Sequence, residues 1–247
     1  YSNYRKKIMN IIYFAGGNRL QTLEKIVDSE SFKVTRIYVA NIESNFECYQ
    51  LFAEKNKIDL TIASKKNIDE LFKFNGEDIL LSVGYRFIIP ESVFSLPKYA
   101  INIHPSLLPK YKGAYSGFAI IENGEKETGI TAHFIDKGVD TGDIIKQKTI
   151  PLDVLDTIIS MSQKITEIEP VFVLNTLELI KDKKINRLKQ ERQLNEKIYN
   201  IKRTPEDSNI DASLPLTELV SLIKACDSKK FPAYFYINGQ KINIKLS

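Results

Sequence analysis

Cysteine is scarce in this chain, because only Cys48 and Cys226 occur among its 247 residues. Two thiols are too few for a disulfide framework or a metal cluster, and we expect both to stay reduced in a cytoplasmic protein. Long apolar runs are lacking too, since none approaches the roughly 20 residues that a membrane helix needs. The chain is therefore predicted not to span a membrane and to have no membrane partner.

Charge of one sign is not concentrated anywhere. Lys and Arg number 35 against 31 Asp and Glu, a net charge of +4, and the lysines are spread along the chain. Nucleic-acid binders more often gather basic residues on one face, so a solvated surface is favoured and no nucleic-acid partner is expected. Apolar residues at 43% indicate a globular protein with a real core. No Met precedes Met9, so residues 1–8 are interpreted either as an extension or as a segment foreign to the natural chain.

Apolar runs and helical spacings alternate along most of the chain. Residues 8–15 are almost continuously apolar, Gly16 and Gly17 follow, and apolar residues then recur at helical spacing from Leu20, which predicts strand, turn and helix. Further strands are expected at 34–40, 60–63, 79–84, 99–103, 129–135 and 144–150, and helices at 46–52 and 68–72. Run-like strands separated by helices predict an α/β fold, a Rossmann-like, mostly parallel sheet with helices on both faces.

The sequence changes character after Lys184. Before it, a helical pattern over 156–184 surrounds Pro170, which is expected to kink or split the helix. After it, a polar surface loop over 186–209 precedes a short amphipathic helix over 216–225. Asn238-Gly239 between alternating apolar segments predicts a β-hairpin over 234–244, which should pack on the body or on another subunit. We predict a catalytic domain over 1–185 and a small C-terminal extension over 186–247.

Two segments at the ends of the first and fifth predicted strands carry candidate chemistry. Gly16 to Arg19 opens a helix, where amides can hold an anion, but a tight turn that needs glycine explains it equally well. It lacks the glycine pattern of dinucleotide sites and the P-loop lysine. Asn102 and His104 lie two apart on a strand and so share a face, at the edge where parallel sheets bind ligands. A structural histidine is the alternative.

A third segment, residues 136–143, is a loop rich in Asp and Gly. Its spacing does not fit a calcium-binding loop, and we expect no metal. A carboxylate delivered beside His104 could fix the tautomer of the ring and stabilise the imidazolium, as in general-base catalysis. The alternative is an ordinary surface turn.

Taken together, these segments resemble the formyltransferases that use 10-formyltetrahydrofolate. The matching residues, within a resemblance that covers residues 8–185, are Asn102-x-His104-Pro-Ser-Leu-Leu-Pro109, Thr128-Gly129-Ile130-Thr131-x-His133 and Asp136-x-Gly138-x-Asp140-Thr141-Gly142. The resemblance implies an N-formyltransferase with 10-formyltetrahydrofolate as co-substrate and Asn102, His104 and Asp140 as catalytic residues. It also implies a pterin site built by main chain at Arg86, Phe87, Ile88, Asp136, Lys137, Gly138 and Val139.

The chemistry suits these roles. Formyl transfer to an amine passes through a tetrahedral oxyanion, to which the Asn102 carboxamide can donate. An imidazole, with an unperturbed pKa of about 6.5, can take the proton of the amine at neutral pH. Asp140 would orient or charge-stabilise His104, directly or through water, and either residue could finally hold the proton.

The resemblance leaves three possible acceptors. Glycinamide ribonucleotide formyltransferase usually ends soon after the long helix, and methionyl-tRNA formyltransferase has a C-terminal barrel for which the roughly 60 residues after Lys184 are too few. The tail instead resembles the sugar-nucleotide N-formyltransferases. The matching segments are Arg203-x-x-x-Asp207-Ser208-x-Ile210-Asp211, Ile223-Lys224-Ala225 and Phe231-Pro232-Ala233-Tyr234-Phe235. Lys224 stands where Arg is usual, and Lys112-Gly113-Ala114 replaces the commoner Arg-Gly-Arg.

We therefore predict formylation of the amino group of a dTDP- or UDP-linked deoxyamino sugar, for surface polysaccharides such as lipopolysaccharide O-antigen. Lys112 and Arg203 would meet the diphosphate, and a homodimer would form through the C-terminal hairpin. Two other classes stay open. One is a hydrolase that releases formate from the same folate, and the other is a non-catalytic binding module, which is disfavoured because all three polar residues are present.

Overall fold

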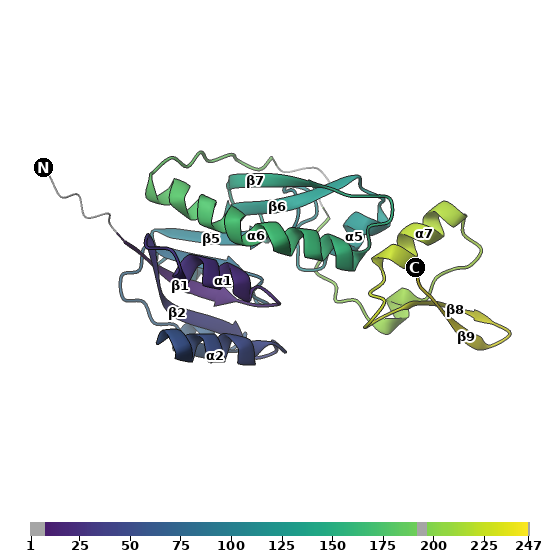
Figure 1. Ribbon diagram of the computed structural model, residues 1–247, viewed down its shortest axis with the longest axis horizontal. Coiled ribbons are helices and arrows are strands. Elements are labelled where there is room, and N and C mark those ends of the chain that lie inside the picture. The colour runs from purple at the N-terminus through teal and green to yellow at the C-terminus, as the bar shows by residue number, and fades with distance from the viewer. Residues whose placement is uncertain (1–7, 192–196, 247) are drawn as a thin grey trace, which may run out of the picture. The chain divides into compact units, whose positions relative to one another are not determined.

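A computed structural model describes residues 8–191 and 197–246 of the chain (Figure 1). The strands of its main sheet are β1 (Met9–Ala15), β2 (Phe32–Ala40), β3 (Asp59–Ala63), β4 (Ile79–Val83), β5 (Tyr99–His104), β6 (Glu127–Phe134) and β7 (Ile144–Pro151). Their order is β3-β2-β1-β4-β5-β6-β7. The pairs from β3 through to β5 are parallel, whereas β5 and β6 are antiparallel. The predicted mostly parallel α/β sheet is confirmed.

The remaining elements complete the order along the chain. They are α1 (Leu20–Val27), α2 (Phe46–Asn56), α3 (Ile68–Leu71), α4 (Glu91–Phe94), α5 (Ser116–Glu122), α6 (Ile158–Lys181), a 3₁₀ turn (Pro205–Ser208), α7 (Leu216–Ala225), β8 (Ala233–Ile237) and β9 (Gln240–Ile244). The predicted strands and the longer helices are found within a few residues of their expected bounds. The short α4, α5 and 3₁₀ turn were not predicted. Elements of one or two turns leave little periodicity in the sequence, and of these short elements only α3 was expected, at 68–72.

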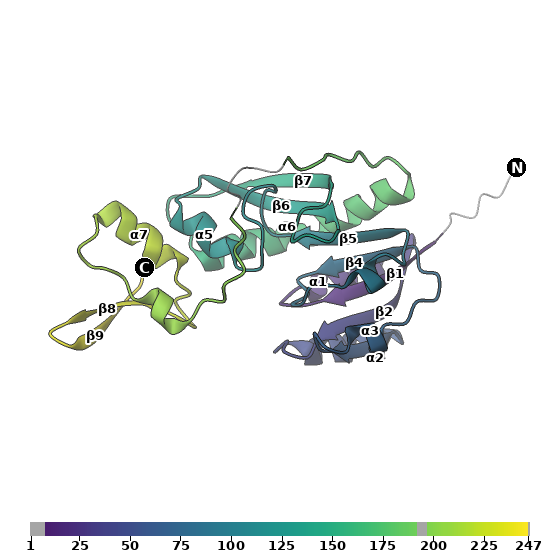
Figure 2. The same ribbon diagram turned by 180° about the vertical axis from the view of Figure 1, so that it is seen from behind.

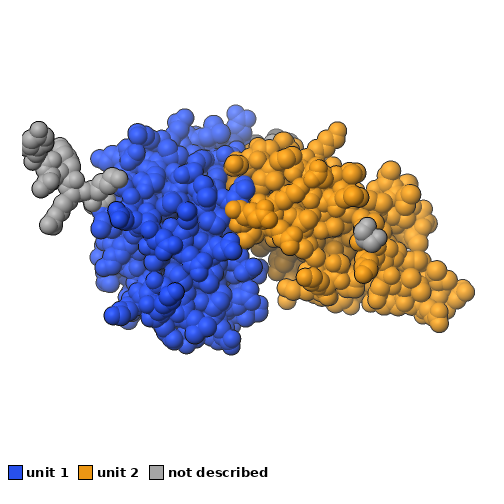
Figure 3. All heavy atoms as spheres, viewed as in Figure 1, with its two compact units in different colours: residues 1–104, 131–147, 168–191 blue, residues 105–130, 148–167, 192–247 orange. Residues whose placement is uncertain are grey.

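The chain divides into two compact units that interleave along the sequence (Figure 3). Unit 1 contains the described residues up to His104 together with 131–147 and 168–191. Unit 2 contains 105–130, 148–167 and the described residues from 197 onward. The predicted boundary near residue 185 would separate two domains that follow one another along the chain, and this division stays a prediction. Residues 1–7 lie outside the described part of the chain.

The core of unit 1 lies on both faces of its strands, which explains why their sequences are apolar in runs. On one face Phe14 stacks on Tyr38 with ring centroids 4.9 Å apart, and α3 and α4 contribute Ile68 and Val93 to the same cluster. On α1, Leu23 and Ile26 are fully buried. The helices α1 and α2 lie in front of these strands in Figure 1, and α3 comes to the front in Figure 2.

Helix α6 is continuous through Pro170, so of the expected kink or split the split does not occur. The proline removes one backbone hydrogen bond and costs about 3 kcal/mol in a helix interior. Beyond the proline, however, Phe172, Val173 and Leu177 are buried. Each buried side chain of this size contributes about 1.5–3 kcal/mol, so burial outweighs the loss.

The predicted C-terminal hairpin is confirmed in unit 2. Strands β8 and β9 pair from Ala233↔Ile244 to Ile237↔Gln240. Asn238 and Gly239 have φ of 49° and 80°, the positive values that a two-residue hairpin turn requires. Cys226 and Ala233 lie in one apolar cluster, so the hairpin packs against the end of α7. No helix in the described ranges is long and apolar enough to cross a bilayer.

Candidate active site

The site is built on two neighbouring strands of unit 1. Asn102 and His104 lie on β5, and the antiparallel register places Asn102 opposite His133 and His104 opposite Thr131 on β6. Directly opposed residues point to the same face, so four polar side chains gather there. His104, Thr131 and His133 are buried. The sequence predicted the shared face of Asn102 and His104.

Asp140 reaches this face from the loop between β6 and β7. Its Oδ2 lies 3.4 Å from Nδ1 of His104. Its Oδ1 lies 3.4 Å from Nδ2 of Asn102 and 3.5 Å from Nε2 of His133. The structure thus places Asn102 and His104 next to the Asp140 carboxylate. The three predicted catalytic side chains therefore lie together within a single compact unit.

His133 fixes the orientation of the Asn102 carboxamide. Its Nδ1 lies 2.8 Å from the carbonyl oxygen of Phe134. A carbonyl can only accept, so Nδ1 carries the proton and Nε2 of the neutral ring is an acceptor. That Nε2 lies 3.2 Å from Nδ2 of Asn102, which therefore donates to it. The sequence motif contained His133, but no role was predicted for it.

The Asp140 loop is held in an uncommon conformation. Asp140 has a φ of 53°, in the left-handed region that non-glycine residues rarely adopt. Thr141 Oγ1 donates to Asp136 Oδ1 at 2.6 Å. At the end of the loop, a Cβ on Gly142 would lie 1.9 Å from the carbonyl oxygen of Phe134, so only glycine fits. These contacts hold the carboxylate over β5.

The comparisons with known proteins decide the family. The family described as Formyl transferase matches residues 29–177, more than half of the chain. The chain belongs to the formyl transferase family. A methionyl-tRNA formyltransferase from Caldanaerobacter subterraneus subsp. tengcongensis is 35% identical over 179 residues, which are 72% of this chain and 56% of the relative. The match thus spans little more than half the length of that relative.

Solved structures share the fold of this formyltransferase over nearly its whole length. A 4-N formyltransferase from Francisella tularensis has a TM-score of 0.80 at 20% identity and covers 96% of this chain and 97% of its own. An N-formyltransferase from Helicobacter canadensis, described in complex with folinic acid and dTDP-3-aminofucose, has a TM-score of 0.74 at 22% identity and covers 96% and 86%.

The two segments expected to form the pterin site of this formyltransferase are accessible. Arg86 and Ile88 are exposed, as are Asp136, Lys137 and Gly138, whereas Phe87 and Val139 are half-buried. Lys137 Nζ lies 3.0 Å from Glu91 Oε2 at the start of α4, three residues after Ile88. The ion pair brings the loop toward the segment that follows β4. Their role in binding pterin stays a prediction.

In the loop from Gly16 to Arg19, the groups that could bind an anion already contact carboxylates of the chain itself. Gly17 N–H donates to Glu43 Oε2 at 2.9 Å, and Arg86 Nε donates to the same oxygen at 3.1 Å. Arg19 forms an ion pair with Glu169. A Cβ on Gly16 would lie 2.1 Å from the carbonyl oxygen of Gly84. The loop therefore fits the tight turn better than the anion site, the two interpretations that the sequence left open.

Lys112 and Arg203 lie in unit 2. Lys112 is buried, and its carbonyl accepts from the Tyr199 N–H at 2.8 Å. The Arg203 guanidinium pairs with Glu122 and lies 4.8 Å from the ring centroid of Phe118. These are internal contacts of unit 2, and binding of a diphosphate by either residue stays a prediction.

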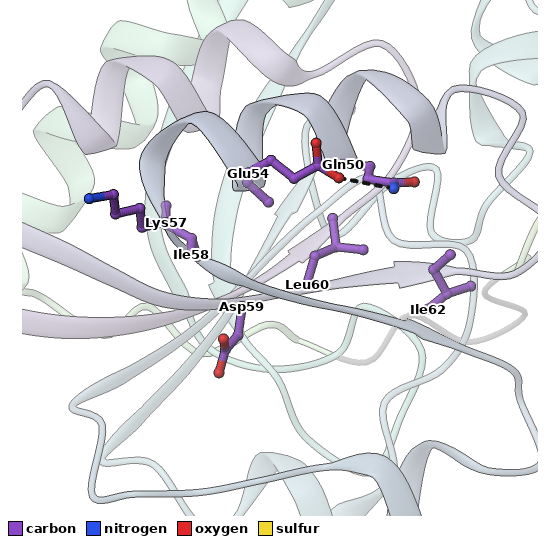
Figure 4. A pocket seen from close by; sticks show the side chains of 8 residues that line it. Gln50, Glu54, Lys57, Ile58, Asp59, Leu60 and Ile62 are labelled. Atoms are coloured by element: carbon purple, nitrogen blue, oxygen red, sulfur yellow. Dashed lines mark hydrogen bonds between the residues drawn. The ribbon is translucent and has the colours of Figure 1, made fainter.

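A surface hollow elsewhere in unit 1 contains none of the candidate catalytic residues. It has a volume of about 700 Å³ and lies between α2 and the edge strand β3 (Figure 4). Its lining residues are Gln50, Ala53, Glu54, Lys57, Ile58, Asp59, Leu60 and Ile62. Within the described ranges, no group of three or more His, Cys, Asp and Glu side chains is placed to hold a metal ion.

Proposed function

We propose that this formyltransferase moves the formyl group of 10-formyltetrahydrofolate to the amino group of a dTDP- or UDP-linked deoxyamino sugar. The observation that carries the proposal is the meeting of Asn102 and His104 with the Asp140 carboxylate, at 3.4 Å each. A donor, a base and a carboxylate around one point are what acyl transfer to an amine requires. Surface-polysaccharide synthesis is the process that such a product would serve.

The first step is attack of the amine on the formyl carbon, which places negative charge on the formyl oxygen. Asn102 is the donor for this oxyanion. Its Nδ2 lies 3.2 Å from His133 Nε2 and 3.4 Å from Asp140 Oδ1, so the hydrogen now directed at Asp140 must turn to the formyl oxygen when the substrates bind. His133 holds that nitrogen in place at 3.2 Å. A donor whose nitrogen is held by a second contact needs less reorganisation in the transition state than a freely rotating one, which is why such groups lower the barrier.

The attacking amine must also lose a proton. Nδ1 of His104 faces Asp140, so Nε2 is the nitrogen that we assign to the amine. The carboxylate stabilises the imidazolium as it forms. The proton then passes to the tetrahydrofolate nitrogen as the C–N bond to the formyl carbon breaks, which completes the transfer.

Coverage along the chain supports a nucleotide sugar as acceptor. The Francisella and Helicobacter structures match 96% of this chain, including its C-terminal part, whereas the methionyl-tRNA formyltransferase match spans 72%. The Helicobacter protein is described with dTDP-3-aminofucose. The closed first loop also speaks against glycinamide ribonucleotide, because a phosphate at Gly17 would meet the Glu43 carboxylate.

Turnover of 10-formyltetrahydrofolate against a panel of dTDP- and UDP-linked amino sugars tests the proposal. Glycinamide ribonucleotide and methionyl-tRNA serve as competing acceptors. We expect a formylated sugar from at least one panel member. Free formate without formylated product would indicate a hydrolase, and absence of both would indicate a binding protein.

We further propose that two copies associate through the β8–β9 hairpin. Tyr236 and Ile237, near the tip of the hairpin, are 56% and 51% exposed, and a second copy could cover these apolar side chains. Tyr236→Glu should shift sedimentation from dimer to monomer, whereas Lys229→Glu, outside the hairpin, should not. A monomeric unsubstituted chain at micromolar concentration would refute the dimer.

A further inference from the structure

The segment that follows α6 crosses the outer strands of unit 1 and reaches the catalytic loop. Leu188 pairs with Ile144 on β7 through two backbone hydrogen bonds of 2.8 and 2.9 Å. The Arg187 guanidinium lies 3.9 Å from the ring centroid of Phe134 at the end of β6. These two contacts fix the path of the chain immediately before Gln190.

The Gln190 side chain forms hydrogen bonds to the backbone of the loop that carries Asp140. Its Nε2 donates to the backbone carbonyl of Asp140 at 3.0 Å and to that of Gly142 at 2.7 Å. Both amide hydrogens of the side chain are thereby used on the two carbonyls that flank Thr141. Gln190 is half-buried, so water competes only partly for these carbonyls.

The Asp140 backbone needs such support. Its φ of 53° is a conformation that persists at non-glycine residues only where the surroundings impose it. Rotation of this backbone would swing the carboxylate away from His104, to which it now lies at 3.4 Å. The side chain itself contacts two histidines and an amide but does not restrain its own main chain.

We infer that Gln190 is a positioning residue for Asp140: it holds the carbonyls of the loop so that the carboxylate faces His104 and Asn102. The inference rests on the proposed function, since it assumes that Asp140 serves catalysis. Gln190 touches neither His104 nor Asn102 in the described contacts, and its effect passes entirely through the loop backbone.

The test uses Gln190→Met, which keeps length and neutrality but has no N–H donor. Lys189→Met is the matched control, because Lys189 is the exposed neighbour. We expect Gln190→Met to lower kcat about 10- to 100-fold, the scale of a misplaced catalytic group, and to change the KM for 10-formyltetrahydrofolate much less. The control should behave as the unsubstituted chain does.

A second measurement needs no substrate. The chain has only two histidines, and both lie within about 3.5 Å of the Asp140 carboxylate, so their ring signals in NMR spectra report its position. In Gln190→Met these signals should move toward those of Asp140→Asn, with the remaining amide spectrum and the urea midpoint little changed. Ring signals that match the unsubstituted chain would overturn the inference.

The two measurements separate the possible failures. If the unsubstituted chain formylates no sugar of the panel, the proposed function fails, and the ring signals still test the link between Gln190 and Asp140. If the chain is active and Gln190→Met retains full kcat, the positioning role fails while the proposed function stands.

Discussion

Replacing Asp140 with Asn is the sharpest perturbation of the proposed chemistry. The side chain keeps its shape and loses its charge. The choice of Asn matters because residue 140 has a φ of 53°. Asn tolerates this region, whereas Ala would add roughly 1–2 kcal/mol of backbone strain and confuse loss of chemistry with loss of structure.

The expected size follows from the contacts of the carboxylate. Asp140 lies 3.4 Å from the His104 ring, and in the proposed mechanism it orients this base and stabilises the imidazolium that forms. General-base assistance of this kind is worth about 10²–10⁴ in rate, which corresponds to about 2.7–5.4 kcal/mol of barrier. The free energy of unfolding should change by about 1 kcal/mol or less, because the fold retains all its apolar contacts.

The assay is single-turnover formyl transfer from 10-formyltetrahydrofolate to the accepted sugar, with folinic-acid affinity measured by calorimetry. Asp143→Asn is the control, since it makes the same change three residues further on, at a side chain with no role in the mechanism. His104→Ala should be at least as inactive as Asp140→Asn and remain folded. Transfer within about threefold of the unsubstituted rate in both variants would refute the mechanism.

Two further predictions concern stability in unit 1. Burial, only partly offset by Arg19, raises the pKa of Glu169 above 4.5, so its contribution to stability is complete below that pH and is lost as pH rises through the folded-state pKa. Glu169→Gln should flatten this part of the pH dependence of urea unfolding, and an unchanged curve would contradict the assignment. Gly16→Ala should lower the free energy of unfolding by about 1–3 kcal/mol, because its Cβ would meet the Gly84 carbonyl at 2.1 Å; a midpoint equal to the unsubstituted one would contradict that contact.

The sequence was most informative where one physical cause dominates. Strands β1 and β4 are buried on both faces, so their residues are almost all apolar and their position could be predicted. The hairpin was predictable because Asn238 and Gly239 alone supply the positive φ values that its turn demands. Whether α6 would be split at Pro170 could not be decided from the sequence, because its continuity depends on burial that only the tertiary structure supplies.

The candidate site was predictable in part for the same reason. Period-two geometry places Asn102 and His104 on one face of any strand, whatever the rest of the fold. A carboxylate from the 136–143 loop beside His104 was one of two interpretations of that loop, and the family resemblance singled out Asp140. The position of the Asp140 carboxylate depends on the positive φ of that residue and on Gln190, which is 50 residues away in the chain. No local sequence pattern indicates either feature.

The antiparallel strand β6 explains why the site has this composition. Its register sets His133 against Asn102 and Thr131 against His104. A slip of one residue would turn His133 to the opposite face and free the Asn102 amide from its acceptor, because side chains alternate along a strand. The loop after β6 closes on the last residue of that strand, because Phe134 N–H donates to the Asp143 carbonyl at 2.9 Å. One reversed strand therefore orients the Asn102 carboxamide, the proposed oxyanion donor, and anchors the Asp140 loop. The geometry of the trio thus depends on the register of β5 and β6 as much as on the three side chains themselves.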